Sequence, residues 1–172
     1  MSAILSYGVV VASSVVSVLS FVSIPVFGHL SDKIGRKNMY MLGAAATGVF
    51  GFIYFGMLGT GSKPVIFFAI ILSLIPHDMM YGPQAALIAE SFTGRLRYSG
   101  SSLGYQLASV IAGGPAPLIA AWLFGTYHSS YAIAIYIALC AVITLVATAL
   151  MTDYTGKDIS GEYQTPGGGN VL

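Results

Sequence analysis

The stretch GHLSDKIGRK, residues 28–37, is a short polar loop between two long apolar runs, 3–27 and 39–60. A helix needs about 20 largely apolar residues to cross the hydrocarbon core of a bilayer, and both runs are long enough. The loop carries three cations, and cytoplasmic loops of membrane proteins collect Lys and Arg. The stretch therefore predicts a membrane hairpin whose turn faces the cytoplasm.

Further apolar runs follow this hairpin and extend the predicted bundle. Residues 153–172 are polar and Gly-rich, which is typical of a disordered tail. The sequence therefore predicts an all-α integral membrane protein with no soluble domain. The predicted spans are 3–27, 39–60, 64–89, 99–124 and 130–152.

The composition also indicates a lipid environment. Apolar residues make up 56% of the 172 residues and charged residues 8%, against roughly 25% charged in an average soluble domain. A soluble chain of this length could not bury so much apolar surface. The net charge of +1 indicates no nucleic-acid partner. A single cysteine, Cys140, excludes an intramolecular disulfide.

The cations alternate between the two sides of the predicted membrane. The second loop has one cation, Lys63, and the fourth loop has none. By the positive-inside rule the N-terminus lies outside and the C-terminus in the cytoplasm. Five spans with an exterior start are unusual for a free-standing protein, so we expect further chain before residue 1. The six cations on the predicted cytoplasmic side are Lys33, Arg36, Lys37, Arg95, Arg97 and Lys157.

Each of the main residues in the first loop has a structural role that suits a tight cytoplasmic turn. Gly28 permits a close helix neighbour and Gly35 a tight reversal, whereas Asp32 can accept backbone N–H bonds. Arg36 and Lys37 can hold the loop in the cytoplasm and pair with carboxylates. The pattern G-x-L-x-D-[RK]-x-G-R-[RK] resembles the signature loop of the major facilitator superfamily. An ordinary basic loop is the alternative.

A second set of motifs resembles the metabolite:proton symporter branch of that superfamily. That branch includes carriers of shikimate, α-ketoglutarate, proline and betaine. Its members have twelve spans in two halves, and the five spans here resemble the eighth to the twelfth. The resemblance thus implies a missing N-terminal half, a bacterial inner membrane, and protons and a small polar metabolite as ligands. The motifs are YGPQAA at 81–86, AESF at 89–92, RLRYSG at 95–100, SLGYQ at 102–106 and GGPAP at 113–117.

Polar residues at helical spacing indicate which spans face a transport pathway, because they are costly in lipid. Such stripes occur on the first, third and fourth spans, so we expect the second and fifth at the periphery. The second span offers small residues for close packing instead. Serines that bond back to the i−4 carbonyl are the alternative explanation of these stripes. The stripe residues are Ser13, Ser17 and Ser20, then His77, Tyr81 and Gln84, then Ser102, Gln106, Ser109 and Gly113.

His77 and Asp78 lie near the middle of the third span, where a lone ionisable group costs at least ~2.5–3.5 kcal/mol. Pro76 and Pro83 each remove a backbone hydrogen bond nearby. These features predict a proton or substrate site. Adjacent helical residues point about 100° apart, so we expect no direct contact between the two and a pairing of Asp78 with Tyr81. A purely structural pairing with other helices is the alternative.

Two further features suggest conformational change. Glu90, Arg95 and Arg97 stand at the cytoplasmic end, where they could form an ion-pair latch with Asp32 or Arg36, or simply anchor the helix ends. In the fourth span a Gly and Pro cluster predicts a bend, either a hinge or a fixed shape. The cluster comprises Gly113, Gly114, Pro115 and Pro117.

The sequence contains no metal-ligand cluster, Walker loop or nucleophile–base pair at recognisable spacing, so we expect no enzyme, cofactor or metal site. The resemblance implies proton-coupled uptake of an organic acid or osmolyte by alternating access. Two alternatives stay open: a non-transporting remnant or interaction protein, and a half-size carrier active as a homo-oligomer.

Overall fold

The structure, a computed structural model, describes residues 2–92 and 96–156, with side chains from Ser14 onward. It confirms the predicted all-α architecture with five apolar helices long enough to cross a membrane. Four are single helices: α1 (Ser2–Ile34), α2 (Arg36–Gly59), α3 (Lys63–Glu90) and α6 (Ser130–Leu150). The other is built from three pieces: α4 (Arg97–Ala108), the π-helical turn η1 (Ser109–Gly113) and α5 (Ala116–Tyr127).

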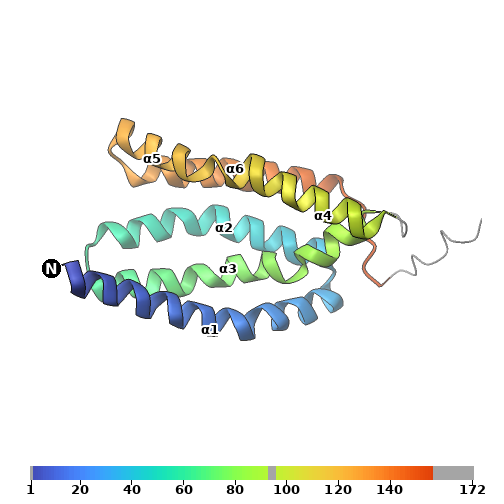
Figure 1. The fold of residues 1–172 in the computed structure, drawn as a ribbon, viewed down its shortest axis with the longest axis horizontal. Helices are drawn as coiled ribbons and strands as arrows, with labels where there is room; N and C mark the ends of the chain where they lie inside the picture. The colour runs from blue at the N-terminus through green and yellow to red at the C-terminus, as the bar shows by residue number, and fades with distance from the viewer. Residues whose placement is uncertain (1, 93–95, 157–172) are drawn as a thin grey trace, which may run out of the picture.

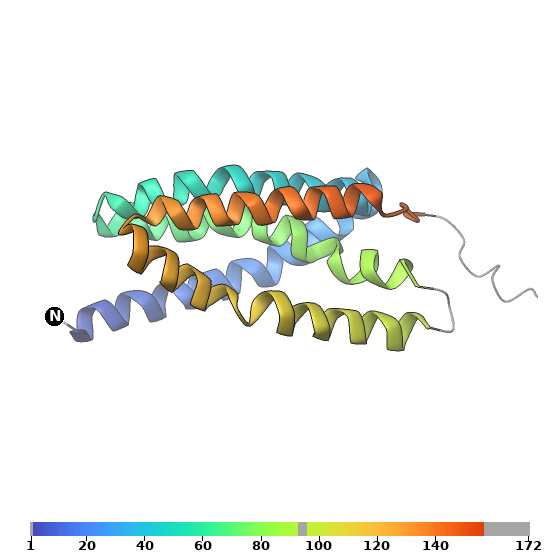
Figure 2. The ribbon, with the colours of Figure 1, turned by 90° about the horizontal axis from the view of Figure 1, so that it is seen from above.

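The helices run side by side along one long axis (Figure 1). α2 packs against both α3 and α6, and α1 packs against the other side of α3. The α4–α5 span contacts α6 through α5 and α3 through α4. Seen from above, α6 lies along α2 while α4 and α5 run beside them (Figure 2). The loop between α1 and α2, the end of α3, the start of α4 and the end of α6 lie at the same end of the bundle.

Glycines permit the closest helix contacts. A Cβ atom at Gly82 of α3 would lie 2.8 Å from the backbone nitrogen of Gly28 and 3.0 Å from the carbonyl oxygen of Ile24. A Cβ at Gly43 of α2 would lie 2.6 Å from the side chain of Met80. Both distances are shorter than van der Waals contact, so these crossings need glycine. They hold α3 tightly between α1 and α2.

The expectation that α2 lies at the periphery is wrong. α2 packs on both α3 and α6, and five of its residues line a cavity on the side of α3. Its Gly43 and Gly48 allow α3 and α6 to approach closely, which places α2 between them. The cavity-lining residues of α2 are Tyr40, Thr47, Phe50, Gly51 and Tyr54.

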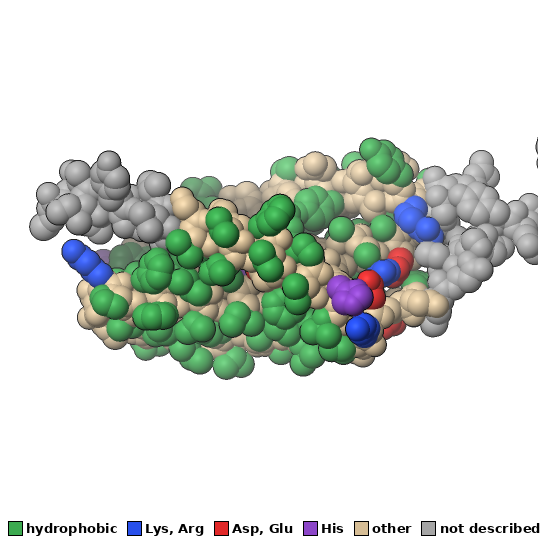
Figure 3. Space-filling view, turned by 90° about the horizontal axis from the view of Figure 1, so that it is seen from below, with side chains coloured by type: hydrophobic (Ala, Val, Ile, Leu, Met, Phe, Trp, Pro, Cys, Tyr) green, Lys and Arg blue, Asp and Glu red, His purple; other side chains and the backbone are tan. Residues whose placement is uncertain are grey.

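The surface of the bundle is apolar between its ends. On the face shown in Figure 3, hydrophobic side chains cover the middle, and charged side chains lie towards the two ends. Large apolar side chains such as Phe21, Ile143 and Leu150 are exposed. An apolar belt of this kind is the surface that a bilayer requires. The chain is a multi-pass membrane protein.

Candidate functional site

The carboxylate of Asp78 is fully buried between α1 and α3, at 0% exposure. Ser20 donates hydrogen bonds to its two oxygens, at 3.1 and 3.3 Å, and Ser23 donates to Oδ2. His77 Nδ1 lies 2.8 Å from Oδ1. A buried carboxylate costs free energy unless donors surround it, and three side chains supply them here. Asp78 is therefore the polar centre of the α1–α3 contact.

The prediction that His77 and Asp78 do not touch is wrong. Their Cα–Cβ bonds diverge, but the imidazole folds back to Asp78 while Ser20 and Ser23 draw the carboxylate towards α1. Tyr81 stacks on the ring of His77, with centroids 5.5 Å apart and planes 14° apart, rather than pairing with Asp78. Helical spacing predicted the shared face of His77 and Tyr81, but not the rotamer of His77.

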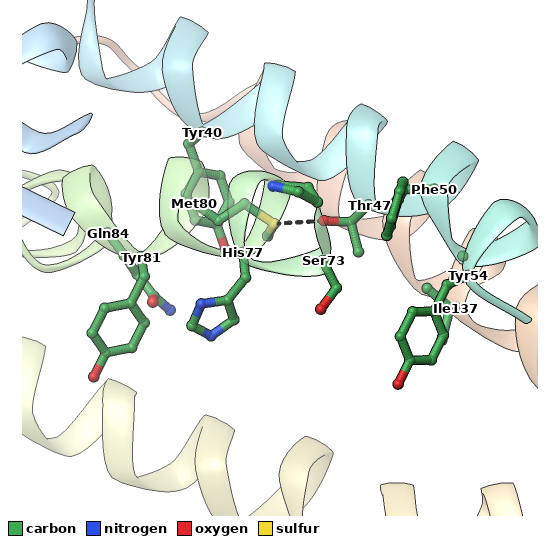
Figure 4. Close-up of a pocket in the computed structure, with 12 residues that line it drawn as sticks. Tyr40, Thr47, Phe50, Tyr54, Ser73, His77, Met80, Tyr81, Gln84 and Ile137 are labelled. Atoms are coloured by element: carbon green, nitrogen blue, oxygen red, sulfur yellow. Dashed lines mark hydrogen bonds between the residues drawn. The ribbon is translucent and has the colours of Figure 1, made fainter. Parts of the chain in front are cut away.

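His77 projects from α3 into a cavity of about 360 Å³ between α2 and α3 (Figure 4). Its side chain is 61% exposed, although that of Asp78 beside it is sealed. Thr47 and Met80 contact each other across this cavity through a hydroxyl–sulfur hydrogen bond of 3.6 Å. The imidazole ring of His77 thus lies between this cavity and the buried carboxylate of Asp78.

A second cavity, of about 420 Å³, lies between α3 and α4. Tyr81 and Gln84 line both cavities, and Ser102 and Gln106 line the second from α4. With His77, the structure thus brings five of the predicted pathway residues around adjoining spaces. Ser109 does not line either cavity, because its hydroxyl bonds back to the carbonyl oxygen of Tyr105 at 2.9 Å. Ser109 therefore fits the alternative explanation, a serine that bonds back to the i−4 carbonyl oxygen of its own helix.

Some site residues were missed by the sequence analysis. Ser23 lies three residues after Ser20 and so on the same helix face, a spacing that could have revealed it. On α2, the polar residues Tyr40, Thr47 and Tyr54 recur every seven residues, which is two turns of a helix. A seven-residue spacing keeps side chains on one helix face, so this pattern could have identified α2 as a cavity-lining helix.

At the end of the bundle that holds the loop between α1 and α2, Arg36 joins three helices. Its guanidinium bonds Asp32 Oδ1 of α1 at 2.8 and 3.0 Å, and contacts Glu90 of α3. Gly35, at φ +104°, makes the reversal that delivers Arg36 to this place. Within the described residues, Glu90 Oε2 and Arg97 Nε are buried without a hydrogen-bond partner. Arg95 lies outside the described residues.

The residues after α6 fold back onto this loop. Lys37 Nζ donates to the carbonyl oxygens of Ala149 and Met151 at 2.8 and 2.7 Å. In return, the backbone N–H of Arg36 donates to Thr155 Oγ1 at 2.9 Å, and Asp153 accepts from Thr155. This tail segment, residues 151–155, therefore belongs to the folded bundle. The predicted disordered tail began too early, and its residues 157–172 lie outside the described part.

The prolines act differently in the two spans. α3 continues without interruption through Pro76 and Pro83. In the fourth span, η1 ends at Gly113, and Pro115 directly precedes α5, with Pro117 in its first turn. A π-helical turn followed by a proline changes the backbone ladder locally. The predicted bend therefore falls on this segment, where the ribbon is interrupted between α4 and α5 (Figure 2).

The described part of the chain offers no group of three His, Cys, Asp or Glu side chains that could hold a metal ion. Instead the site offers hydrogen bonding, one buried carboxyl group, one imidazole and two adjoining cavities. Such an arrangement can bind a small polar molecule and exchange a proton.

The chain has clear relatives among characterised sequences. The family described as the Major Facilitator Superfamily matches residues 3–165. The shikimate transporter of Escherichia coli K12 is 38% identical over 140 residues, which cover 78% of this chain and 31% of that protein. The inner membrane metabolite transport protein YhjE of the same organism is 35% identical over 130 residues, covering 75% and 29%.

A relative named for osmolytes lies further away. The ectoine/proline transporter ProP of Corynebacterium glutamicum is 28% identical over 142 residues, which cover 83% of this chain and 28% of that protein. The chain thus spans about a third of the length of these relatives. All three names are those of transporters rather than of enzymes. No solved structure matches the chain.

Proposed function

Because the chain belongs to the major facilitator superfamily, we propose that it forms the C-terminal part of a proton-coupled transporter for a small polar metabolite. The five helices are proposed to be the eighth to twelfth spans of a twelve-span carrier in the bacterial inner membrane. Their N-terminal end faces outward and the loop at residues 28–37 faces the cytoplasm. An N-terminal half is the proposed partner, and the substrate binds between the halves.

The substrate class follows from the relatives and from the cavities. Relatives carry names for shikimate, an organic acid, and for ectoine and proline, which are osmolytes. The adjoining cavities present hydroxyl, amide and aromatic groups, suited to a small polar solute: Tyr81, Gln84, Ser102, Tyr105 and Gln106. An organic acid or an osmolyte is therefore proposed.

The observation that carries proton coupling is the burial of Asp78 beside a cavity-exposed His77. A coupled carrier needs a group that is charged in one state and neutral in another. Burial away from water disfavours the charged form of a carboxylate, while hydrogen-bond donors favour it. Ser20 and Ser23 of α1 supply hydrogen-bond donors to Asp78 of α3, so a rearrangement of α1 against α3 would change the number of donors around the carboxylate.

Alternating access is supported by the Arg36 cluster. Arg36 ties α1, α2 and α3 together through Asp32 and Glu90, and Glu90 is only 14% exposed. An ion pair shielded from water is either made or broken, because a half-open pair is costly. Glu90 Oε2 and Arg97 Nε have no partner here, so they are available for the other conformation of the proposed latch.

The test compares two transport modes of the full-length carrier in liposomes. With Asp78→Asn we expect loss of accumulation driven by a pH gradient and retention of substrate counterflow, because exchange needs no net proton movement. Thr144→Ala is the control and should keep both modes, because it removes a hydroxyl of α6 that bonds back to the carbonyl oxygen of Cys140 and lines neither cavity. Normal pH-driven accumulation with Asn at 78 would remove Asp78 from the coupling mechanism.

A further inference from the structure

Asp78 has no surface of its own through which to receive a proton. It is fully buried, and its side chain is bonded by Ser20, Ser23 and His77. A serine hydroxyl can donate or accept a hydrogen bond but does not ionise near neutral pH. Imidazole is the side chain that gains and loses a proton in this range. Of these three side chains, His77 is the one that lines either cavity, so it offers a route for a proton from a cavity to Asp78.

His77 has the position that such a transfer requires. Its Nδ1 lies 2.8 Å from Asp78 Oδ1, which is hydrogen-bonding distance. Its side chain is 61% exposed, and the ring projects into the cavity between α2 and α3 (Figure 4). One ring nitrogen thus meets the carboxylate while the other is left for the cavity.

We propose that His77 is the proton relay between the cavity and Asp78. A hydronium ion in the cavity gives a proton to Nε2 of the neutral ring and leaves water, and the Nδ1 proton moves to Asp78 Oδ1. The ring is then neutral again with its proton on Nε2, and the carboxyl is neutral. One proton has crossed and no electrons have moved. Ser20, whose hydroxyl contacts both carboxyl oxygens, can then turn to accept from the new carboxyl proton on Oδ1.

The surroundings favour this assignment. The other titratable residues that line the cavity are Tyr40, Tyr54 and Tyr81, and tyrosine ionises near pH 10. α1 faces Asp78 with serines, and α4 lines the adjoining cavity with Ser101, Ser102, Tyr105 and Gln106. Of these lining residues, His77 is the one with a ring nitrogen at hydrogen-bonding distance from Asp78. Tyr81 stacks on its ring and acts as a positioning residue.

The relay rests on the proposed function, in which Asp78 is the coupling carboxyl, but it can be measured on the 172-residue chain alone. The chain in liposomes is subjected to a rapid drop in pH, and the infrared band of the protonated carboxyl is followed in time. Asp78→Asn identifies the band that belongs to Asp78. For His77→Ala we expect protonation slowed at least about tenfold with the same final amplitude.

Added imidazole should restore the rate of His77→Ala, because a diffusing ring can fill the vacated cavity. His29→Ala, which removes an exposed histidine of α1, should leave the rate unchanged. Tyr81→Phe keeps the stacked ring and should behave as the parent chain, whereas Tyr81→Leu should slow protonation about 2–10-fold. A wild-type rate in His77→Ala, a slowed rate that imidazole does not restore, or no Asp78 band at any pH would each overturn the relay.

The relay and the proposed function fail in different ways. If protonation of Asp78 depends on His77 but Asp78→Asn keeps pH-driven accumulation in the full-length carrier, the coupling proposal fails and the relay stands. If accumulation requires Asp78 but its protonation ignores His77, only the relay fails.

Discussion

Lys37, in the first turn of α2, donates from Nζ to the carbonyl oxygen of Met151, which lies just beyond α6, at 2.7 Å. A cation at this place satisfies carbonyl groups that the end of a helix leaves free, and it complements the negative end of the helix dipole. In the opposite direction, Thr155 accepts from the backbone N–H of Arg36 at 2.9 Å, where the cap residue Gly35 has no side chain. The start of α2 and the end of α6 therefore cap each other.

Lys37→Met should destabilise the bundle. Hydrogen bonds to charged groups contribute roughly 1.5–3 kcal/mol each, reduced here by partial exposure, so we expect a loss of about 1 kcal/mol. Thermal unfolding of the purified chain in detergent measures it. Lys63→Met is the control, because Lys63 begins α3, where a cation opposes the dipole. Equal melting temperatures for the Lys37 variant and the parent would disprove the mutual cap.

Gly82→Ala should separate α1 from α3. The new Cβ would meet backbone atoms of Gly28 and Ile24, which cannot rotate away. Overpacking of this kind costs typically 1–3 kcal/mol, to be measured by unfolding in detergent. Gly125→Ala in α5 meets nothing within 4 Å, and should be neutral or stabilising because alanine favours helix. A stable Gly82 variant would mean that the α1–α3 crossing is looser than described.

Asp32→Asn and Gly35→Val should slow the full-length carrier more than they weaken substrate binding. Asp32 pairs with Arg36, and Gly35 holds φ +104°, which a branched side chain rarely adopts. Neither residue lines either cavity, so the two should bias conformation rather than contact substrate. Turnover is compared with equilibrium binding, and a reduction of at least about fivefold in turnover is expected. Equal losses of binding in both conformations would contradict a latch.

The 172-residue chain alone should not transport. A pathway between two halves is incomplete when five helices are present, so uptake of labelled shikimate or proline into liposomes should equal that of protein-free liposomes. Co-reconstitution of the chain with an N-terminal half is the positive control, in which uptake is expected. Uptake by the chain alone, rising with its density in the membrane, would instead favour a homo-oligomeric carrier.

The spans were predictable because they depend on local composition. A run of apolar residues predicts a transmembrane helix whatever its neighbours in the fold are. In the same way, the glycines and prolines of the fourth span predicted its break. The Arg36 cluster was predicted only as a choice among several carboxylates and cations. Which of them pair depends on how α1, α2 and α3 meet, and the sequence does not specify those distances.

The contact between His77 and Asp78 could not be predicted from spacing. It depends on a side-chain rotamer, and that rotamer depends on Ser20 and Ser23 of a different helix, more than fifty residues earlier. The position of α2 was misjudged for a related reason. Its small residues were recognised, but close packing on two neighbours also moves a helix inward, and its tyrosines then line a cavity.

The π-helical turn η1 sets the rotation of α5 about the helix axis relative to α4. Each residue of a helix advances the chain by about 100°, and a π-helical turn holds one residue more than an α-helical turn. That extra residue fixes how α5 is rotated relative to α4, so that Gln106 lines a cavity while Leu118 and Trp122 are exposed on the apolar surface. Deleting Ala112 would remove this offset and turn α5 relative to α4 by about a quarter of a revolution. One residue of η1 therefore sets which faces of α4 and α5 lie on the same side of the span.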